Sequence, residues 1–227
     1  ISERFHISSK KLAIADVLLM TFGTNHYYEL NEKGFVVANC HKCPATIFTE
    51  KEASPEQIVN MAIPLLTDLI TQKENIKVVF TISPYRYKKY GFHRNQLSKA
   101  CLLLAVEQLC QRFPRNVSYF PAFEILLDEL RDYRYYAEDM LHPSSTALKY
   151  IWEIFADKYL SSSAKRMMAD WSPIEKALGH HFISEGEEQH KEFLENTYTI
   201  LTKFHEAYPS VNVDKELFYI NKKLNIS

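Results

Sequence analysis

Three short apolar segments, separated by stretches with helix signals, constrain most strongly what this chain can fold into. They cover residues 16–22, 76–82 and 116–120, and each is closed by a turn signal containing Gly, Asn or Pro. Short apolar runs bounded in this way are typical of strands that are buried on both faces of a parallel sheet. We therefore predict three parallel strands.

Helix signals fill the intervals between these strands. Residues 54–57, Ser-Pro-Glu-Gln, combine a cap hydroxyl, a proline at the first helical position and a glutamine at the third, which is a capping box. Residues 96–112 are apolar around most of the helix circumference, as in a buried crossover helix. Further helices are expected at 123–130 and 144–160, and a short extra strand or loop at 35–38.

Alternating strands and helices predict right-handed βαβ units. The expected fold class is therefore α/β: a three-layer α/β/α sandwich with a mainly parallel, flavodoxin-like sheet and ligands at the carboxyl ends of its strands. Three strands make a thin sheet, and the chain begins with Ile in mid-pattern, so we expect additional strands in a preceding segment.

The composition changes after residues 161–163, three consecutive serines that we interpret as a hinge. We predict one domain at 1–160 and a C-terminal helical extension at 161–227. The extension contains a His180-His181 pair and an acidic stretch at 185–188, for which we favour a solvated helix face over a metal site.

Composition excludes several classes of function. Because 27 Lys+Arg nearly balance 28 Asp+Glu, no overall charge attracts nucleic acid or an anionic membrane. The five glycines are too dispersed for a dinucleotide-binding or phosphate-binding loop, and we expect no cofactor. The longest apolar run, residues 100–106, is too short to cross a bilayer. Four sparse cysteines favour reduced thiols and a cytoplasmic setting, although a removed signal peptide remains an alternative.

The most informative candidate for chemistry is the segment Asp139-Met140-Leu141-His142-Pro143, which precedes a predicted helix. In a compact turn, Asp139 can accept a hydrogen bond from one imidazole nitrogen of His142, so that the other nitrogen can remove a proton from a nucleophile. The alternative is that both residues only close a turn and cap the helix.

A second candidate, Gly23-Thr24-Asn25, directly follows a predicted strand and should share the carboxyl edge of the sheet with His142. There, Asn25 and Gly23 could stabilise an oxyanion. The alternative is an ordinary loop, in which asparagine is common.

Together these residues resemble the SGNH hydrolases, which carry Gly-x-Asn after a central strand and Asp-x-x-His-Pro before the last helix. The match is closer to the GSCFA family, a related branch. The resemblance covers about residues 1–160 and rests also on the strings at 37–42, 80–86, 91–100 and 128–143. It implies a hydrolase-like fold that uses Ser, His and Asp, with Asn and backbone amides at the oxyanion.

The nucleophile that the resemblance implies is absent from this sequence, which contains no Gly-Ser-Cys-Phe-Ala string. We therefore expect the serine in a preceding segment. Ser83 and Ser98 are not predicted to replace it, because a strand-ending turn and an early helix position explain them.

Two other segments contain reactive or charged side chains. The loop 85–96 is basic and aromatic, and four of its residues are predicted to bind substrate: Arg86, His93, Asn95 and Gln96. The alternative is that this segment is an ordinary solvated loop. Residues 40–43, Cys-His-Lys-Cys, form a single Cys-x-x-Cys, which is a weak metal signal, so we predict no metal there.

The leading hypothesis is a serine-dependent ester hydrolase or acyltransferase acting on an acylated small molecule or carbohydrate. The alternative is a non-catalytic module that binds a glycan or peptide on the same fold. A third class, a metal-dependent hydrolase, requires His93, Asp139 and His142 to converge. The sequence does not indicate an oligomeric state.

Overall fold

The computed structural model describes residues 2–37, 40, 42–179 and 187–224. Contacts divide the chain into two compact units, Ile1–Ile154 and Phe155–Ser227, so the division lies a few residues before residue 160. Each unit is described by itself.

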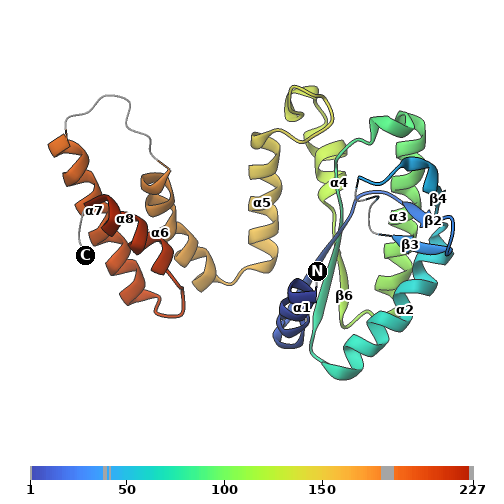
Figure 1. The fold of residues 1–227 in the computed structure, drawn as a ribbon, viewed down its shortest axis with the longest axis horizontal. Helices are drawn as coiled ribbons and strands as arrows, with labels where there is room; N and C mark the ends of the chain where they lie inside the picture. The colour runs from blue at the N-terminus through green and yellow to red at the C-terminus, as the bar shows by residue number, and fades with distance from the viewer. Residues whose placement is uncertain (1, 38–39, 41, 180–186, 225–227) are drawn as a thin grey trace. The chain divides into compact units, whose positions relative to one another are not determined.

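A parallel three-stranded sheet forms the centre of the first unit (Figure 1), and the prediction of three parallel strands is confirmed. Its strands are β1 (Val17–Phe22), β5 (Lys77–Ile82) and β6 (Val117–Phe120), in the order β1-β5-β6. The register aligns Phe22 with Ile82 and Thr81 with Phe120. The carboxyl ends of the three strands therefore meet at one edge.

Helices cover the sheet on both sides, which gives the predicted α/β/α arrangement. In Figure 1, α2 and α3 lie on one side of the sheet, and α4 and the start of α5 lie on the other. The predicted capping box at Ser54 and Gln57 is present. The helices of this unit are α1 (Ser2–Ile14), α2 (Pro55–Gln72), α3 (Phe92–Arg112), the short α4 (Ala122–Glu124) and the first part of α5 (Ser145–Tyr159), which continues past the division after Ile154.

The main core lies between the sheet and the pair α2 and α3. Its buried residues come from α2, α3, β5 and β6, and the two helices also pack against each other. They are Val59, Leu66, Val78, Phe80, Ala105, Val106, Leu109 and Val117.

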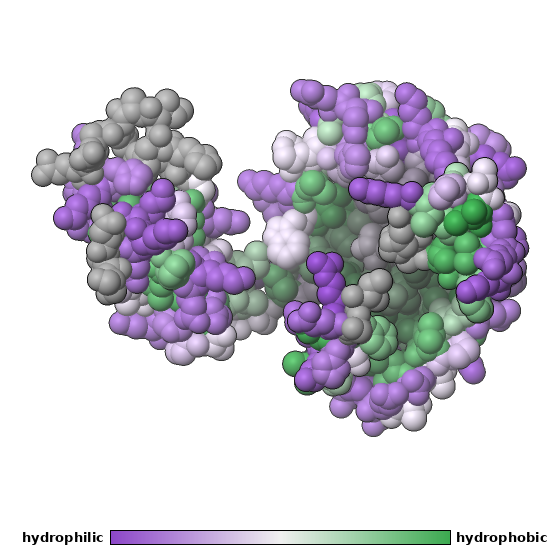
Figure 2. Space-filling view, in the orientation of Figure 1, coloured by the Kyte–Doolittle hydropathy of each residue, from purple (hydrophilic) through white to green (hydrophobic). Residues whose placement is uncertain are grey.

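The prediction that β1 is buried on both faces is wrong. Val17 and Leu19 are 58% and 50% exposed. Among the described residues β1 pairs only with β5, so its other edge is unpaired. Its inward face lines a groove of about 700 Å³ between α1 and α2, with Leu18, Met20 and Phe22 in the wall. Figure 2 shows hydrophobic side chains gathered in a hollow of this unit.

A second sheet, antiparallel and small, was predicted only as the short piece at 35–38. It contains β2 (His26–Leu30), β3 (Phe35–Val37) and β4 (Phe48–Glu52), in the order β3-β2-β4. The sequence of β4, Phe-Thr-Glu-Lys-Glu, is mostly polar and exposed, and therefore lacks the apolar pattern of a buried strand.

The predicted helix at 123–130 has a different geometry. After α4 the chain continues as a π-helix, Ile125–Leu130, which ends at Arg131 in a left-handed conformation (φ 46°). Short 3₁₀ turns complete the unit at Ala45–Ile47, Lys88–Tyr90 and Tyr133–Tyr135.

The second unit is helical, as predicted for the C-terminal extension. It contains α6 (Ser162–Leu178), α7 (Glu187–Ala207) and α8 (Asp214–Leu224), which pack around a core of their own. The His180-His181 pair and residues 185–186 lie outside the described residues. None of the helices in the described ranges combines the length and the hydrophobicity required to cross a membrane.

Candidate functional site

The Asp139 carboxylate is bonded to His142 at two places. Its Oδ1 accepts the backbone N–H groups of Leu141 at 2.9 Å and His142 at 3.0 Å. Its Oδ2 lies 2.5 Å from Nδ1 of the His142 ring. Met140, which lies between them, has a positive φ of 60°, a backbone conformation that residues other than glycine seldom adopt. The turn is thus folded around the carboxylate.

These contacts determine which nitrogen of the His142 imidazole carries the proton. The Asp139 pKa is lowered to about 2, first by the backbone N–H of His142 and then by its ring, so the carboxylate stays ionised at neutral pH. Because Nδ1 faces an anion, it carries the proton, and Nε2 is left with its lone pair. No described residue forms a hydrogen bond or ion pair with Nε2, and the His142 side chain is 61% exposed.

Arg86 holds the His142 loop in place. Its Nη1 donates to the Met140 carbonyl at 2.9 Å, and its backbone N–H donates to the Leu141 carbonyl. Its guanidinium also lies over the rings of Phe92 and Tyr136. These contacts give Arg86 a positioning role, while its predicted contact with a substrate stays a prediction.

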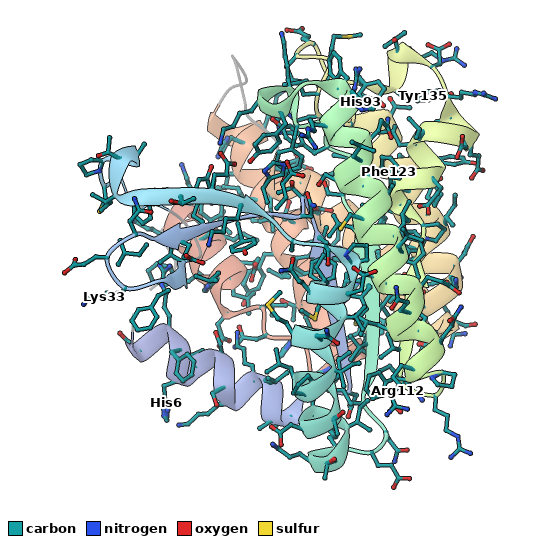
Figure 3. All side chains as sticks on the ribbon, turned by 90° about the vertical axis from the view of Figure 1, so that its right-hand side faces the viewer. His6, Lys33, His93, Arg112, Phe123 and Tyr135 are labelled. Atoms are coloured by element: carbon teal, nitrogen blue, oxygen red, sulfur yellow. The ribbon has the colours of Figure 1, made fainter. Side chains whose placement is uncertain are left out.

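A line of tyrosine rings connects His142 to the end of β1. The Tyr85 ring lies 4.4 Å from the His142 ring and meets the Tyr87 ring edge-on. The Tyr87 hydroxyl in turn lies so close to Gly23 that a Cβ atom there would be 2.2 Å away. His142 and Gly23 therefore belong to the same edge of the sheet. Figure 3 shows His93 and Tyr135 at one end of this unit and Arg112, the last residue of α3, at the other.

One face of α3 contacts the carboxyl edge of the parallel sheet through three buried polar side chains. Asn95 accepts the Tyr87 N–H at 3.0 Å, and Ser98 accepts the Asn25 N–H at 2.9 Å. Lys99 is 1% exposed, and its Nζ donates to the carbonyls of Gly23 and Ser83, each at 2.6 Å. This role of Ser98 and Lys99 was not predicted from the sequence. The signal was their place, with Asn95, at helical spacing i, i+3 and i+4, which puts the three polar side chains on one face of the helix.

The other predicted residues lie around this edge without meeting His142. Asn25 is buried, and its Nδ2 donates to the Ala53 carbonyl at 2.9 Å, so the prediction that it serves an oxyanion stays a prediction. His93 and Gln96 are exposed at the start of α3. The buried Asn95 supports the loop, as described above, and its predicted contact with a substrate is likewise still a prediction.

The two serines that the sequence analysis set aside have structural partners. Ser83 Oγ accepts the N–H of Tyr85, and Ser98 Oγ lies 3.0 Å from the hydroxyl of Thr24. Neither is in contact with His142 in the part of the chain that the structure describes.

No group of three His, Cys, Asp or Glu residues suited to a metal ion occurs within the described ranges. The convergence of His93, Asp139 and His142 that a metal-dependent hydrolase would require is therefore not observed among the described residues. Cys40 and Cys43 are free thiols, and His41 between them lies outside the described residues.

Comparison with known proteins identifies the family. The family model described as GSCFA family matches residues 1–155, and that described as GSCFA domain protein, C-terminal domain, matches residues 171–226. No curated protein and no solved structure matches the chain. Since the first match covers more than half of the sequence and includes the Asp139 and His142 pair, the chain belongs to the GSCFA family.

Proposed function

We propose that this GSCFA protein is a serine-dependent ester hydrolase or acyltransferase in which His142 is the general base. The observation that carries the proposal is the exposed imidazole whose Nδ1 is held by Asp139 and whose Nε2 has no partner among the described residues. This arrangement of an acid and a histidine activates hydroxyl nucleophiles on several unrelated folds.

In the proposed reaction, a serine hydroxyl attacks the ester carbonyl while its proton passes to Nε2 of His142. The C–O bond to the alcohol then breaks, and His142 returns the proton to the leaving alcohol. Water, or a second alcohol, attacks the resulting acyl-serine by the same route, which gives hydrolysis or acyl transfer. Asp139 stabilises the imidazolium that forms in each half-reaction.

We propose that the serine is supplied by a segment outside residues 1–227. The unpaired edge of β1 supports this proposal, because a parallel strand added there would end beside Gly23, at the edge where His142 lies. The exposed apolar side chains of β1 and the groove beside it would be covered by such a strand and its helix.

The substrate class in the proposal is an acylated small molecule or carbohydrate. Aromatic side chains around the His142 loop support it, since sugar rings pack well on exposed aromatic faces. Tyr133 is 67% exposed, and its ring lies 6.3 Å from the Tyr136 ring, over which the Arg86 guanidinium also lies.

Hydrolysis of p-nitrophenyl acetate by the full-length protein tests the proposal. We expect His142→Ala to lower kcat/KM by at least about 1,000-fold, because general base and nucleophile act as a unit. His6→Ala is the matched control, since His6 is exposed at the end of the unit opposite His93 (Figure 3) and should leave the rate unchanged. Equal rates for the wild type and His142→Ala would contradict the proposal. Saturable glycan binding without turnover would favour the non-catalytic alternative.

A further inference from the structure

Lys99 presents a buried positive charge at the strand ends without a carboxylate partner among the described residues. Its Nζ is bonded to two backbone carbonyls and lies 5.2 Å from the Tyr87 ring and 5.8 Å from the Phe123 ring. Burial of an ammonium group is unfavourable unless its surroundings compensate, and burial lowers the Lys99 pKa to about 8. At neutral pH the side chain therefore remains mostly protonated and donates to both carbonyls.

The bond to the Gly23 carbonyl fixes the direction of the next N–H group. In a trans peptide the C=O of one residue and the N–H of the next point in opposite directions. With the Gly23 oxygen held by Lys99 on the α3 side, the Thr24 N–H points away from α3. No described residue accepts this N–H.

The neighbouring groups of the same loop are already occupied. The Asn25 N–H is bonded to Ser98, the His26 N–H to the Thr24 hydroxyl, and the Asn25 amide to the Ala53 carbonyl. Among the described residues the Thr24 N–H is thus a backbone donor without a partner, on the edge where tyrosine rings lead to His142.

We propose that Lys99 is a positioning residue, which orients the Gly23–Thr24 peptide so that the Thr24 N–H donates to the developing oxyanion. This inference deepens the proposed function and rests on it. Pre-oriented backbone N–H groups are effective in this role because they need no rearrangement when the charge develops.

The test compares Lys99→Met with Lys77→Met in the full-length protein. Methionine keeps much of the apolar volume of lysine and removes the ammonium. Lys77 is the matched control, because its Nζ also donates to a backbone carbonyl, that of Arg115, but at the amino end of β5. Two readouts are used: kcat and KM for p-nitrophenyl acetate, and the ¹⁵N–¹H resonance of Thr24.

We expect Lys99→Met to lower kcat about 100-fold with little change in KM, and to shift the Thr24 resonance while the β5 resonances stay in place. Lys77→Met should change neither readout for the site. Wild-type kcat together with an unmoved Thr24 resonance in Lys99→Met would overturn the inference, as would a moved resonance with unchanged kcat.

A wild-type protein that hydrolyses no ester would refute the proposed function and the oxyanion role together. The Thr24 resonance would then decide the positioning alone. If Lys99→Met does not fold, Lys99→Arg supplies the same comparison, with kcat expected below that of the wild type. Wild-type kcat and an unmoved Thr24 resonance in that variant would again overturn the inference.

Discussion

At the scale of single residues, the contact between Asp139 and His142 could be predicted from the sequence, whereas the contacts of Lys99 could not. Asp139 and His142 are three residues apart, so one turn brings them together, and the spacing alone predicts their contact. The contacts of Lys99 join positions 76 and 16 residues apart in the chain. Such contacts depend on how α3 packs against the strand ends, which sequence periodicity does not specify.

The ionisation of Asp139 provides the first prediction. Two backbone N–H groups and the His142 ring lower its pKa to about 2, from an ordinary value of 3.8. The stability that these contacts provide is therefore present above the ordinary pKa and is lost as the pH falls through about 2. The ¹³C resonance of the Asp139 carboxyl group should titrate near pH 2.

In His142→Ala the same titration should move upward but stay below 3.8, because the backbone N–H groups remain. His6→Ala should leave it unchanged. A wild-type midpoint near 3.8 would show that the turn does not hold the carboxylate.

Lys99 provides the second prediction, which concerns stability against pH. Its folded-state pKa is about 8, while the unfolded chain keeps the usual value of 10.5. Between these values the unfolded state binds more protons, so the free energy of unfolding rises with pH. The rise from this group is about 3 kcal/mol, at about 1.4 kcal/mol for each pKa unit.

Urea unfolding at pH 7 to 10.5 measures the effect. The free energy of unfolding of the wild type should rise over this window relative to that of Lys99→Met, which lacks the titrating group. The free energy of unfolding of Lys77→Met should follow that of the wild type. Parallel curves for the wild type and Lys99→Met would contradict the burial of a charged Lys99.

At the scale of elements, the sequence predicted best those with a clear hydrophobic or capping pattern. The strands β1 and β5 and the capped helix α2 have strong local signals, whereas β6, which contains Ser118, has a weaker one. The small antiparallel sheet was largely missed because its strands are short and partly polar. The π-helix at Ile125–Leu130 was also missed, because the apolar spacing of one short segment does not distinguish α from π hydrogen bonding.

The small sheet is attached to the loop before α3 by one side-chain cluster. The His26 ring stacks on the Tyr90 ring at 3.7 Å, and Glu50 accepts from the Tyr90 hydroxyl and from Lys89. These bonds hold the pKa of Glu50 below its usual value, even though burial acts in the opposite direction. The cluster is thus an ionised contact between β4 and the loop.

Tyr90→Ala should therefore loosen the small sheet without unfolding the main one. Hydrogen exchange of the β2 and β4 amides should accelerate at least about 10-fold, while that of the β5 amides should not change. Tyr133→Ala is the control, because Tyr133 is an exposed aromatic residue far from these strands in sequence. Uniform acceleration in all three strands would contradict a local attachment.

At the scale of the whole molecule, the chain consists of two units, each with its own core. The second unit buries Ile174, Leu194, Leu201, Phe204, Val213 and Ile220 in the core around α6, α7 and α8. Since a domain requires its own hydrophobic core to fold alone, we predict that residues 155–227 form a stable helical fragment with a cooperative thermal transition.

Two neighbouring substitutions test this core. Leu201 is fully buried and Ile200 is 44% exposed, so Leu201→Ala should lower the free energy of unfolding of the fragment by about 2–5 kcal/mol. Ile200→Ala should lower it by less than about 1 kcal/mol. A broad, non-cooperative melt of the unmodified fragment would show that the second unit depends on the first.

The central claim is that His142, oriented by Asp139, activates a serine of the same protein. Fluorophosphonate labelling of the full-length protein, followed by peptide mass spectrometry, tests it most directly. We predict a single labelled serine outside residues 1–227, with labelling at least about 100-fold slower in His142→Ala and unchanged in His6→Ala. Absence of any labelled serine, or labelling at the wild-type rate in His142→Ala, would contradict it.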